Sequence, residues 1–72
     1  MVNPQAYEVD IFPLAASEGG GFGAIAPDLP GCRSDGETPE EALANIYDAI
    51  ACWIEAAAEA GRAVPQPRRQ AA

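Results

Sequence analysis

Carboxylates are the most numerous side chains in this 72-residue sequence that could perform chemistry, because eleven residues are Asp or Glu. General acid–base catalysis needs such groups to converge in a pocket, whereas Asp10, Asp28 and Asp35 fall on different predicted elements. The chain has neither histidine nor lysine, so the usual activators of a nucleophile are missing. We therefore expect no enzyme activity and no catalytic residues, and a function that depends on binding surfaces.

Two cysteines and a glycine-rich run are the other candidates for chemistry. Cys32 and Cys52 lack the further clustered ligands of a zinc site, so we predict neither a metal nor a cofactor. The run Gly19-Gly20-Gly21-Phe22-Gly23 has the composition of a phosphate-binding loop, but a short strand follows it where a helix should open. We interpret Ala15 to Gly21 as a hairpin loop whose glycines permit unusual backbone dihedrals.

The net charge of −7 limits the classes of partner. A phosphate backbone is bound by clustered Lys and Arg, and the four arginines of this chain are scattered among its acids, so we expect no direct nucleic-acid binding. No apolar run approaches the ~20 residues of a membrane span, and we expect a cytoplasmic protein without membrane contact. The acidic charge either keeps the protein soluble or selects a basic protein partner.

One long helix, from Thr38 to Gly61, is predicted to position most of the acids. Thr38-Pro39-Glu40-Glu41 is a capping box, in which the Thr38 hydroxyl accepts from the Glu41 N–H and the Glu41 carboxylate reaches back to the Thr38 N–H. Pro39 suits the first helical position. Gly61, with Pro65 beyond it, marks the end of the helix.

The predicted helix has three sides of different composition. An apolar side should cover a sheet, and it contains Leu43, Ile46, Tyr47, Ile50, Trp53, Ile54 and Ala57. Small residues beside Trp53 would let a second copy approach closely, although alanine also fills surface positions as the best helix former; together with Val64 beyond the helix, the candidates for self-association are Ala42, Ala49, Trp53, Ala56, Ala60 and Val64. The third side is acidic and has no basic (i, i+4) partners. It is either solvated or a docking face for a basic protein, for which the candidates are Asp28, Glu41, Asp48, Glu55 and Glu59.

Three short strands are predicted before the helix. Tyr7 to Phe12 alternates with period two, and Phe12 breaks the alternation on the polar side, where a second covered surface would explain it. Phe22 to Ala26 forms the second strand, and Cys32 to Ser34 forms the third after the rigid corner Pro27 to Gly31. Asp35-Gly36 is then predicted to turn the chain into the helix.

These elements predict an α+β fold, a small antiparallel three-stranded sheet covered by one long helix in the order β-β-β-α. The sequence leaves open whether a short fourth strand forms around Val64. We expect one domain over residues 1–72, with its core in 7–67 and loose ends at 1–6 and 68–72.

A wider pattern joins the corner to the helix: Gly21-Phe22-Gly23-Ala24, then Pro27-Asp28-Leu29-Pro30-Gly31-Cys32, then Ser34, Gly36, Thr38, Glu40-Glu41-Ala42-Leu43, Asn45-Ile46, Ala49-Ile50 and Trp53. This pattern resembles the N-terminal domain of HicB-family antitoxins, from about Tyr7 to Pro67. The resemblance implies a partial ribonuclease-H-like fold without catalysis. It also implies a partner, a small basic HicA-like toxin that cleaves mRNA. Many family members add a DNA-binding domain, and we expect a stand-alone form because this sequence stops at Ala72.

Two functions follow from this reading. The first is an antitoxin-like protein that binds and neutralises a HicA-like toxin. The alternative is an orphan oligomeric HicB-like module that binds another protein or a small ligand and has no toxin partner. A dimer or tetramer is expected in both cases, because so short a chain buries only a modest core and small domains often depend on association.

Overall fold

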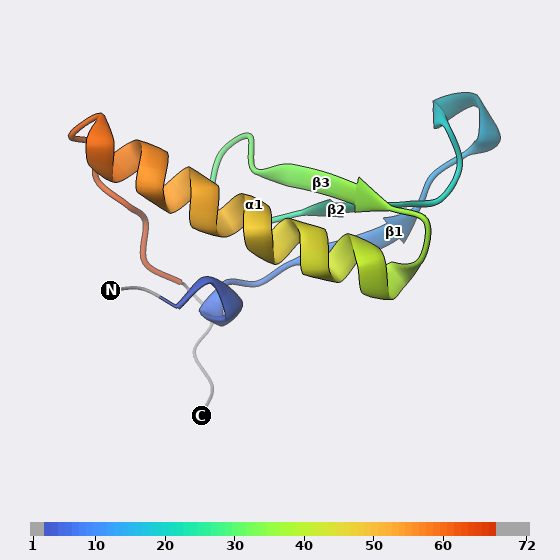
Figure 1. Ribbon diagram of the computed structural model, residues 1–72, viewed down its shortest axis with the longest axis horizontal. Helices are drawn as coiled ribbons and strands as arrows, with labels where there is room; N and C mark the ends of the chain where they lie inside the picture. The colour runs from blue at the N-terminus through green and yellow to red at the C-terminus, as the bar shows by residue number, and fades with distance from the viewer. Residues whose placement is uncertain (1–2, 68–72) are drawn as a thin grey trace.

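The computed structural model describes residues 3–67 and shows an α+β fold of two layers (Figure 1). Three antiparallel strands form the sheet: β1 (Asp10–Pro13), β2 (Phe22–Ile25) and β3 (Arg33–Gly36), in the order β1-β2-β3. Helix α1 (Pro39–Glu59) lies across one face of the sheet, and the short 3-10 helices η1 (Pro4–Ala6) and η2 (Ala16–Glu18) stand before β1 and in the hairpin loop. The predicted three-stranded β-β-β-α architecture is confirmed.

The strand register decides which side chains face the helix. Ile11 pairs with Ala24, and Ala24 pairs with Ser34, so this row points toward α1, where Ala24 is buried. The rows beside it point away from the helix. β1 is shorter than predicted and lies at a sheet edge, where Pro13 is tolerated because it has no N–H to contribute to the ladder.

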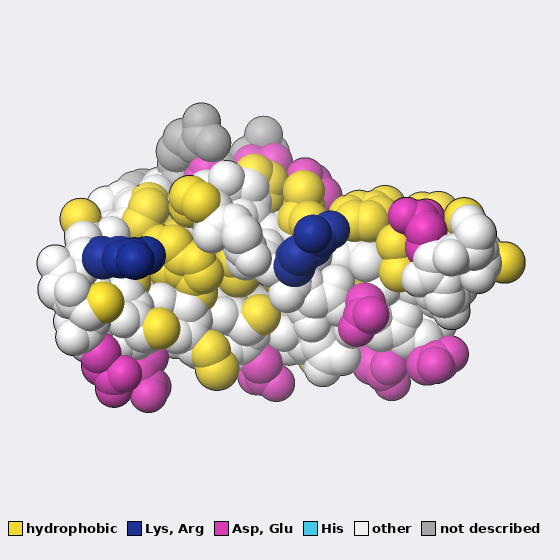
Figure 2. Space-filling view, turned by 90° about the horizontal axis from the view of Figure 1, so that it is seen from above, with side chains coloured by type: hydrophobic (Ala, Val, Ile, Leu, Met, Phe, Trp, Pro, Cys, Tyr) yellow, Lys and Arg dark blue, Asp and Glu magenta, His cyan; other side chains and the backbone are white. Residues whose placement is uncertain are grey.

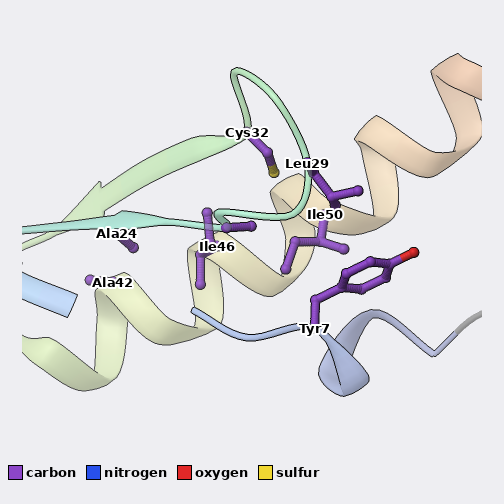
Figure 3. Packing of buried hydrophobic residues seen from close by; sticks show 8 residues of the cluster. Tyr7, Ala24, Leu29, Cys32, Ala42, Ile46 and Ile50 are labelled. Atoms are coloured by element: carbon purple, nitrogen blue, oxygen red, sulfur yellow. The ribbon is translucent and has the colours of Figure 1, made fainter. Parts of the chain in front are cut away.

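The core lies between the sheet and α1. Ile46 and Ile50 of the helix are completely buried, and Tyr7 and the corner residue Leu29 gather around Ile50 (Figure 3). The predicted apolar side of the helix is confirmed, because Ala57 is also buried and the other four residues, Leu43, Tyr47, Trp53 and Ile54, are partly buried.

The predictions for Ala42 and Gly36 were wrong. Ala42 was assigned to a surface strip, but it is completely buried against the sheet. Gly36 was predicted to turn the chain, but it is the last residue of β3. A Cβ atom on Gly36 would lie 2.5 Å from the backbone nitrogen of Ala42, so helix and strand approach backbone to backbone at this point. The missing side chain of Gly36 is what permits the close packing of Ala42.

Both helix ends have the predicted caps, with one change. The Thr38 hydroxyl accepts from the Glu41 N–H at 3.1 Å, while the Glu41 carboxylate accepts from the N–H of Glu37 at 2.9 Å, one residue before the predicted Thr38. At the other end Gly61 has φ 73°, and the N–H groups of Gly61 and Arg62 donate to the carbonyls of Ala58 and Ala57. These two bonds form a Schellman motif.

The two ends of the described chain meet beside the core. Residues 3–6, predicted as a loose lead-in, form a turn in which the Asn3 side chain accepts from the Gln5 N–H at 2.9 Å. After the helix the chain returns toward η1 (Figure 1), and the Tyr7 hydroxyl donates to the carbonyl of Pro65 at 2.5 Å. Within residues 3–67 the segment around Val64 forms no fourth strand. The predicted loose end at 68–72 lies outside the described residues.

Candidate partner-binding surface

An acidic stripe runs along the side of α1 that faces away from the sheet. We define the stripe as Glu41, Asp48, Glu55 and Glu59, all of which are exposed. At 100° per residue these four positions fall within about 40° of one another, and they span about 27 Å along the axis. Figure 2 shows acidic side chains gathered along one rim of the molecule. No Lys or Arg occurs within the helix, so the stripe has no basic neighbour on its own element.

The carboxyl-terminal half of the stripe does not help the helix to fold. Glu55 and Glu59 stand four residues apart, a spacing at which like charges repel. Glu59 is also the last residue of the helix, where the negative end of the dipole disfavours a carboxylate, and the last turn contains no basic residue. Only Glu41 has a clear role in folding, through its cap. The stripe therefore needs an explanation beyond helix stability.

Asp28 does not belong to the stripe. It lies in the corner after β2, and its negative charge is close enough to Tyr7 to raise the pKa of that hydroxyl, in addition to the larger effect of burial. Tyr7 packs on the side of the helix that carries Ile50, which is opposite Glu41. The structure thus brings together four of the five predicted partner-binding acids and separates the fifth.

The predicted self-association strip is interrupted. Besides the buried Ala42, Ala49 and Trp53 are partly buried and pack against the core. The Trp53 indole N–H donates to the carbonyl of Pro30 at 2.9 Å, so this side chain ties the helix to the corner. Val64 is also partly buried. Of the six predicted residues, Ala56 and Ala60 alone are exposed.

A second apolar surface was not among the predicted sites. Phe12, Leu14 and Ile25 are all partly exposed, and the register places Phe12 and Ile25 on the sheet face away from α1. In the sequence the only signal was Phe12, which breaks the alternation of its strand. Leu14 and Ile25 gave no signal, because their orientation depends on the pairing of the strands.

Other kinds of site find little support. Within residues 3–67, no group of three or more His, Cys, Asp or Glu side chains is placed to hold a metal ion. In the same residues no helix is long and apolar enough to cross a membrane. Both cysteines are free, and burial raises the pKa of the Cys32 thiol, which makes it less reactive.

The sequence pattern that defines the HicB-like antitoxins of bacterial toxin–antitoxin systems matches residues 7–71, which is most of the chain. The chain belongs to this family of HicB-like antitoxins. The match includes the corner, the helix with its acidic stripe, and all three strands. No solved structure matches the chain significantly.

Curated relatives of this HicB-like chain carry only a general family name. UPF0150 protein ssr1765 of Synechocystis sp. is 45% identical over 47 residues, which are 65% of this chain and 60% of that relative. UPF0150 protein Ta0767 of Thermoplasma acidophilum is 36% identical over 53 residues, which are 74% of this chain and 77% of the relative. A further Synechocystis protein, UPF0150 protein ssl0259, is 37% identical over 59 residues, which are 82% of this chain and 77% of that relative. The chain therefore spans about 60% of the length of the first relative.

Proposed function

We propose that this HicB-like protein binds and neutralises a small basic HicA-like toxin that cleaves mRNA, and that it does so without catalysis. The acidic stripe on α1 carries the proposal. Membership of an antitoxin family supports a toxin as the partner. The identity of that toxin rests on the resemblance of the sequence to HicB proteins and on the charge of the stripe.

Charge complementarity is the physical basis of recognition in this proposal. Asp48, Glu55 and Glu59 present three exposed carboxylates on one side of the helix, the first two about two turns apart and the last two about one turn apart. A basic surface would replace the repulsion between Glu55 and Glu59 with attraction, so the unfavourable charges of the free helix become favourable in the complex. Electrostatic contacts of this kind raise the association rate and exclude acidic partners, and they weaken as salt is added.

A charge-reversal variant tests the proposal. Any small basic protein encoded beside the gene of this chain serves as the test partner, and its affinity is measured by calorimetry at low and high salt. Replacing Asp48, Glu55 and Glu59 together with lysine should weaken binding roughly a hundredfold at low salt, at about 1 kcal/mol for each reversed charge. The difference between variant and wild type should shrink at high salt. In cells, the variant should fail to rescue growth when the toxin is expressed.

The control is Glu18→Lys, which reverses a single acidic charge in the hairpin loop, away from the helix. The Glu18 carboxylate accepts only the exposed Ala15 N–H in the described structure, so its loss should cost little. Binding should remain nearly unchanged in this control. If the triple variant binds as tightly as wild type, the stripe is not the contact surface. If no basic protein is encoded nearby and none copurifies, the orphan interaction module becomes the better explanation.

The same proposal makes the protein cytoplasmic, because an mRNA-cleaving toxin meets its substrate there. We also propose that the protein acts as a homo-oligomer.

A further inference from the structure

The sheet of this protein is covered on one face only. Helix α1 packs on the face that carries Ala24, and no described helix or strand covers the other face, so that the molecule measures 15 Å along its shortest axis. We call the uncovered side the open face and define it by Asp10, Phe12, Leu14, Gly23, Ile25, Arg33 and Asp35. Six of these residues are placed there by the strand register, and Leu14 follows from its contact with Gly23. Figure 2 shows hydrophobic side chains along the hairpin end of the molecule.

The apolar part of the open face is assembled around Gly23. A Cβ atom on Gly23 would lie 2.6 Å from Cε1 of Phe12 and 3.2 Å from Cδ2 of Leu14, so these two side chains occupy the space above the glycine. An aromatic ring laid over a glycine of the neighbouring strand is a known way to stabilise such a site. Phe12, Leu14 and Gly23 line one hollow with Arg33 and Asp35. The result is a shallow apolar surface with charges at its margin.

The charges on this face complement themselves. Asp10 and Arg33 stand on either side of Ile25 in one row, about 10 Å apart across two strand spacings. Asp35 lies in the next row of β3, on the same face as Arg33. A two-fold axis that runs along β2 would bring Arg33 of one copy over Asp10 of the other. A two-fold axis across the strands, midway between the rows of Ile25 and Gly23, would bring Arg33 over Asp35 and leave Ile25 of each copy beside the centre. Either symmetric arrangement thus gives the arginine a carboxylate partner.

We propose that two copies of this protein pack open face to open face, with Ile25 at the centre and Arg33 paired to an acid of the other copy. A stable interface of standard size buries about 800 Å² per partner, which is about a sixth of the 4906 Å² surface of this molecule, so the contact extends from the open face to its neighbours on the same side. Sheets stacked in this way lie about 10 Å apart, with apolar side chains between them. The break in alternation at Phe12 is then explained, because its ring faces a second core.

A second copy fits this face better than the proposed toxin does. Arg33 is the only basic residue in the three strands, and it stands beside Asp10 and Asp35. A second copy offers an acid to Arg33 and a base to these acids, whereas a uniformly basic partner leaves Arg33 without a carboxylate. The acidic stripe lies on the far side of α1 from the sheet, so a dimer formed through the open face leaves both stripes accessible. Dimer formation does not depend on the toxin proposal, and either proposal can fail alone.

The test measures the mass of the purified protein by light scattering and sedimentation across a wide concentration range. Wild type should have twice the mass of one chain. Ile25→Lys should weaken the dimer by roughly a hundredfold, the effect of substitutions at the centre of an interface, and should keep its circular dichroism. The control Ala56→Lys makes the same charge change on the exposed side of the helix and should remain a dimer. A second set of variants tests the proposal if Ile25→Lys unfolds. Arg33→Asp should dissociate the dimer. Adding either Asp10→Arg or Asp35→Arg to this variant should restore the dimer.

The position of the restoring arginine would also identify the symmetry axis. The proposal is overturned if wild type stays monomeric at every concentration, or if Ile25→Lys folds and still dimerises. It is equally overturned if Ala56→Lys dissociates the protein while Ile25→Lys does not, because the helix side would then be the interface. If Ile25→Lys unfolds and Arg33→Asp still forms a dimer, the proposal is overturned as well.

Discussion

Replacing Gly36 with alanine should separate the helix from the sheet at its first turn. The new Cβ would lie 2.5 Å from the nitrogen of Ala42, 2.8 Å from the carbonyl carbon of Glu41 and 2.9 Å from the Cβ of Glu41. Ordinary contacts begin near 3.4 Å, and the two closest atoms are backbone atoms of a helix that cannot rotate away. The φ of Gly36 is not positive, so alanine adds no dihedral strain there. The whole effect comes from the close approach of strand and helix.

The expected cost follows from this geometry. To reach an ordinary contact the helix must move away by most of an ångström, which loosens the packing of Ala42, now completely buried. Overpacking of a well-packed core typically costs about 1–3 kcal/mol. In a domain of this size each kcal/mol lowers Tm by about 4–8 °C, so the melting temperature should fall by roughly 4 °C at least and by up to about 24 °C.

Gly23→Ala is the matched control, since it makes the same substitution in the neighbouring strand, also without a positive φ. Its new Cβ would meet only the ends of the Phe12 and Leu14 side chains, which can turn outward from the open face. Alanine also recovers part of the entropy that glycine loses in a strand, about 0.5–1 kcal/mol. Both glycine variants are compared in the Ile25→Lys background, where the protein should be monomeric, and Gly23→Ala should be nearly neutral in urea denaturation. If Gly36→Ala is as mild as Gly23→Ala, the inferred backbone contact between β3 and α1 is wrong.

Further predictions concern the contacts that hold the helix and the chain ends to the core. Tyr7→Phe should lower the free energy of unfolding by about 0.5–1.5 kcal/mol in urea titrations, because it removes the hydrogen bond to the Pro65 carbonyl and keeps the ring. Burial raises the folded-state pKa of Tyr7 above 10.0 and that of Cys32 above 9.0, so the unfolded chain releases these protons first as pH rises. Stability should be complete below these ordinary values and fall as pH rises through the higher folded ones, whereas the double variant Tyr7→Phe, Cys32→Ala should show a flatter alkaline decline. Trp53→Phe should cost about 1 kcal/mol through its lost bond to the corner carbonyl, and an unchanged urea midpoint would contradict that role. Glu59→Lys should raise the stability of the free protein by about 0.3–1 kcal/mol, measured by thermal melting, because it removes a carboxylate from the negative end of the helix.

The helix was predictable because its signals are local. Capping, the apolar side and the terminal glycine all involve residues three to seven positions apart, and a helix fixes the relative directions of such residues. Thr38, Ile46, Ile50 and Gly61 therefore behave as predicted. The acidic stripe was predictable for the same reason. Asp28 was not, because its position relative to the stripe depends on how the corner folds against Tyr7.

Small residues were the hardest to place. Ala42 and Ala56 are chemically identical and both suit the helix, yet one is buried and the other exposed. The difference is decided by Gly36, which brings the first turn of the helix onto the sheet. Gly36 and Gly23 have negative φ, unlike the five other glycines. They are glycines because another segment occupies the space of their side chain, and no pattern along the chain reveals this.

By itself, the sequence determined the helix and its caps, the three strands in order, the acidic side and the HicB-like character of the chain. Those features depend on spacing along one element or on a motif that is contiguous in the chain. Only the tertiary structure decided that Ala42 is core, that Asp28 is apart from the stripe and that Phe12 and Ile25 share an uncovered sheet face. These features depend on strand register and on the distance between segments far apart in sequence, and both arise only when the helix and the sheet pack together.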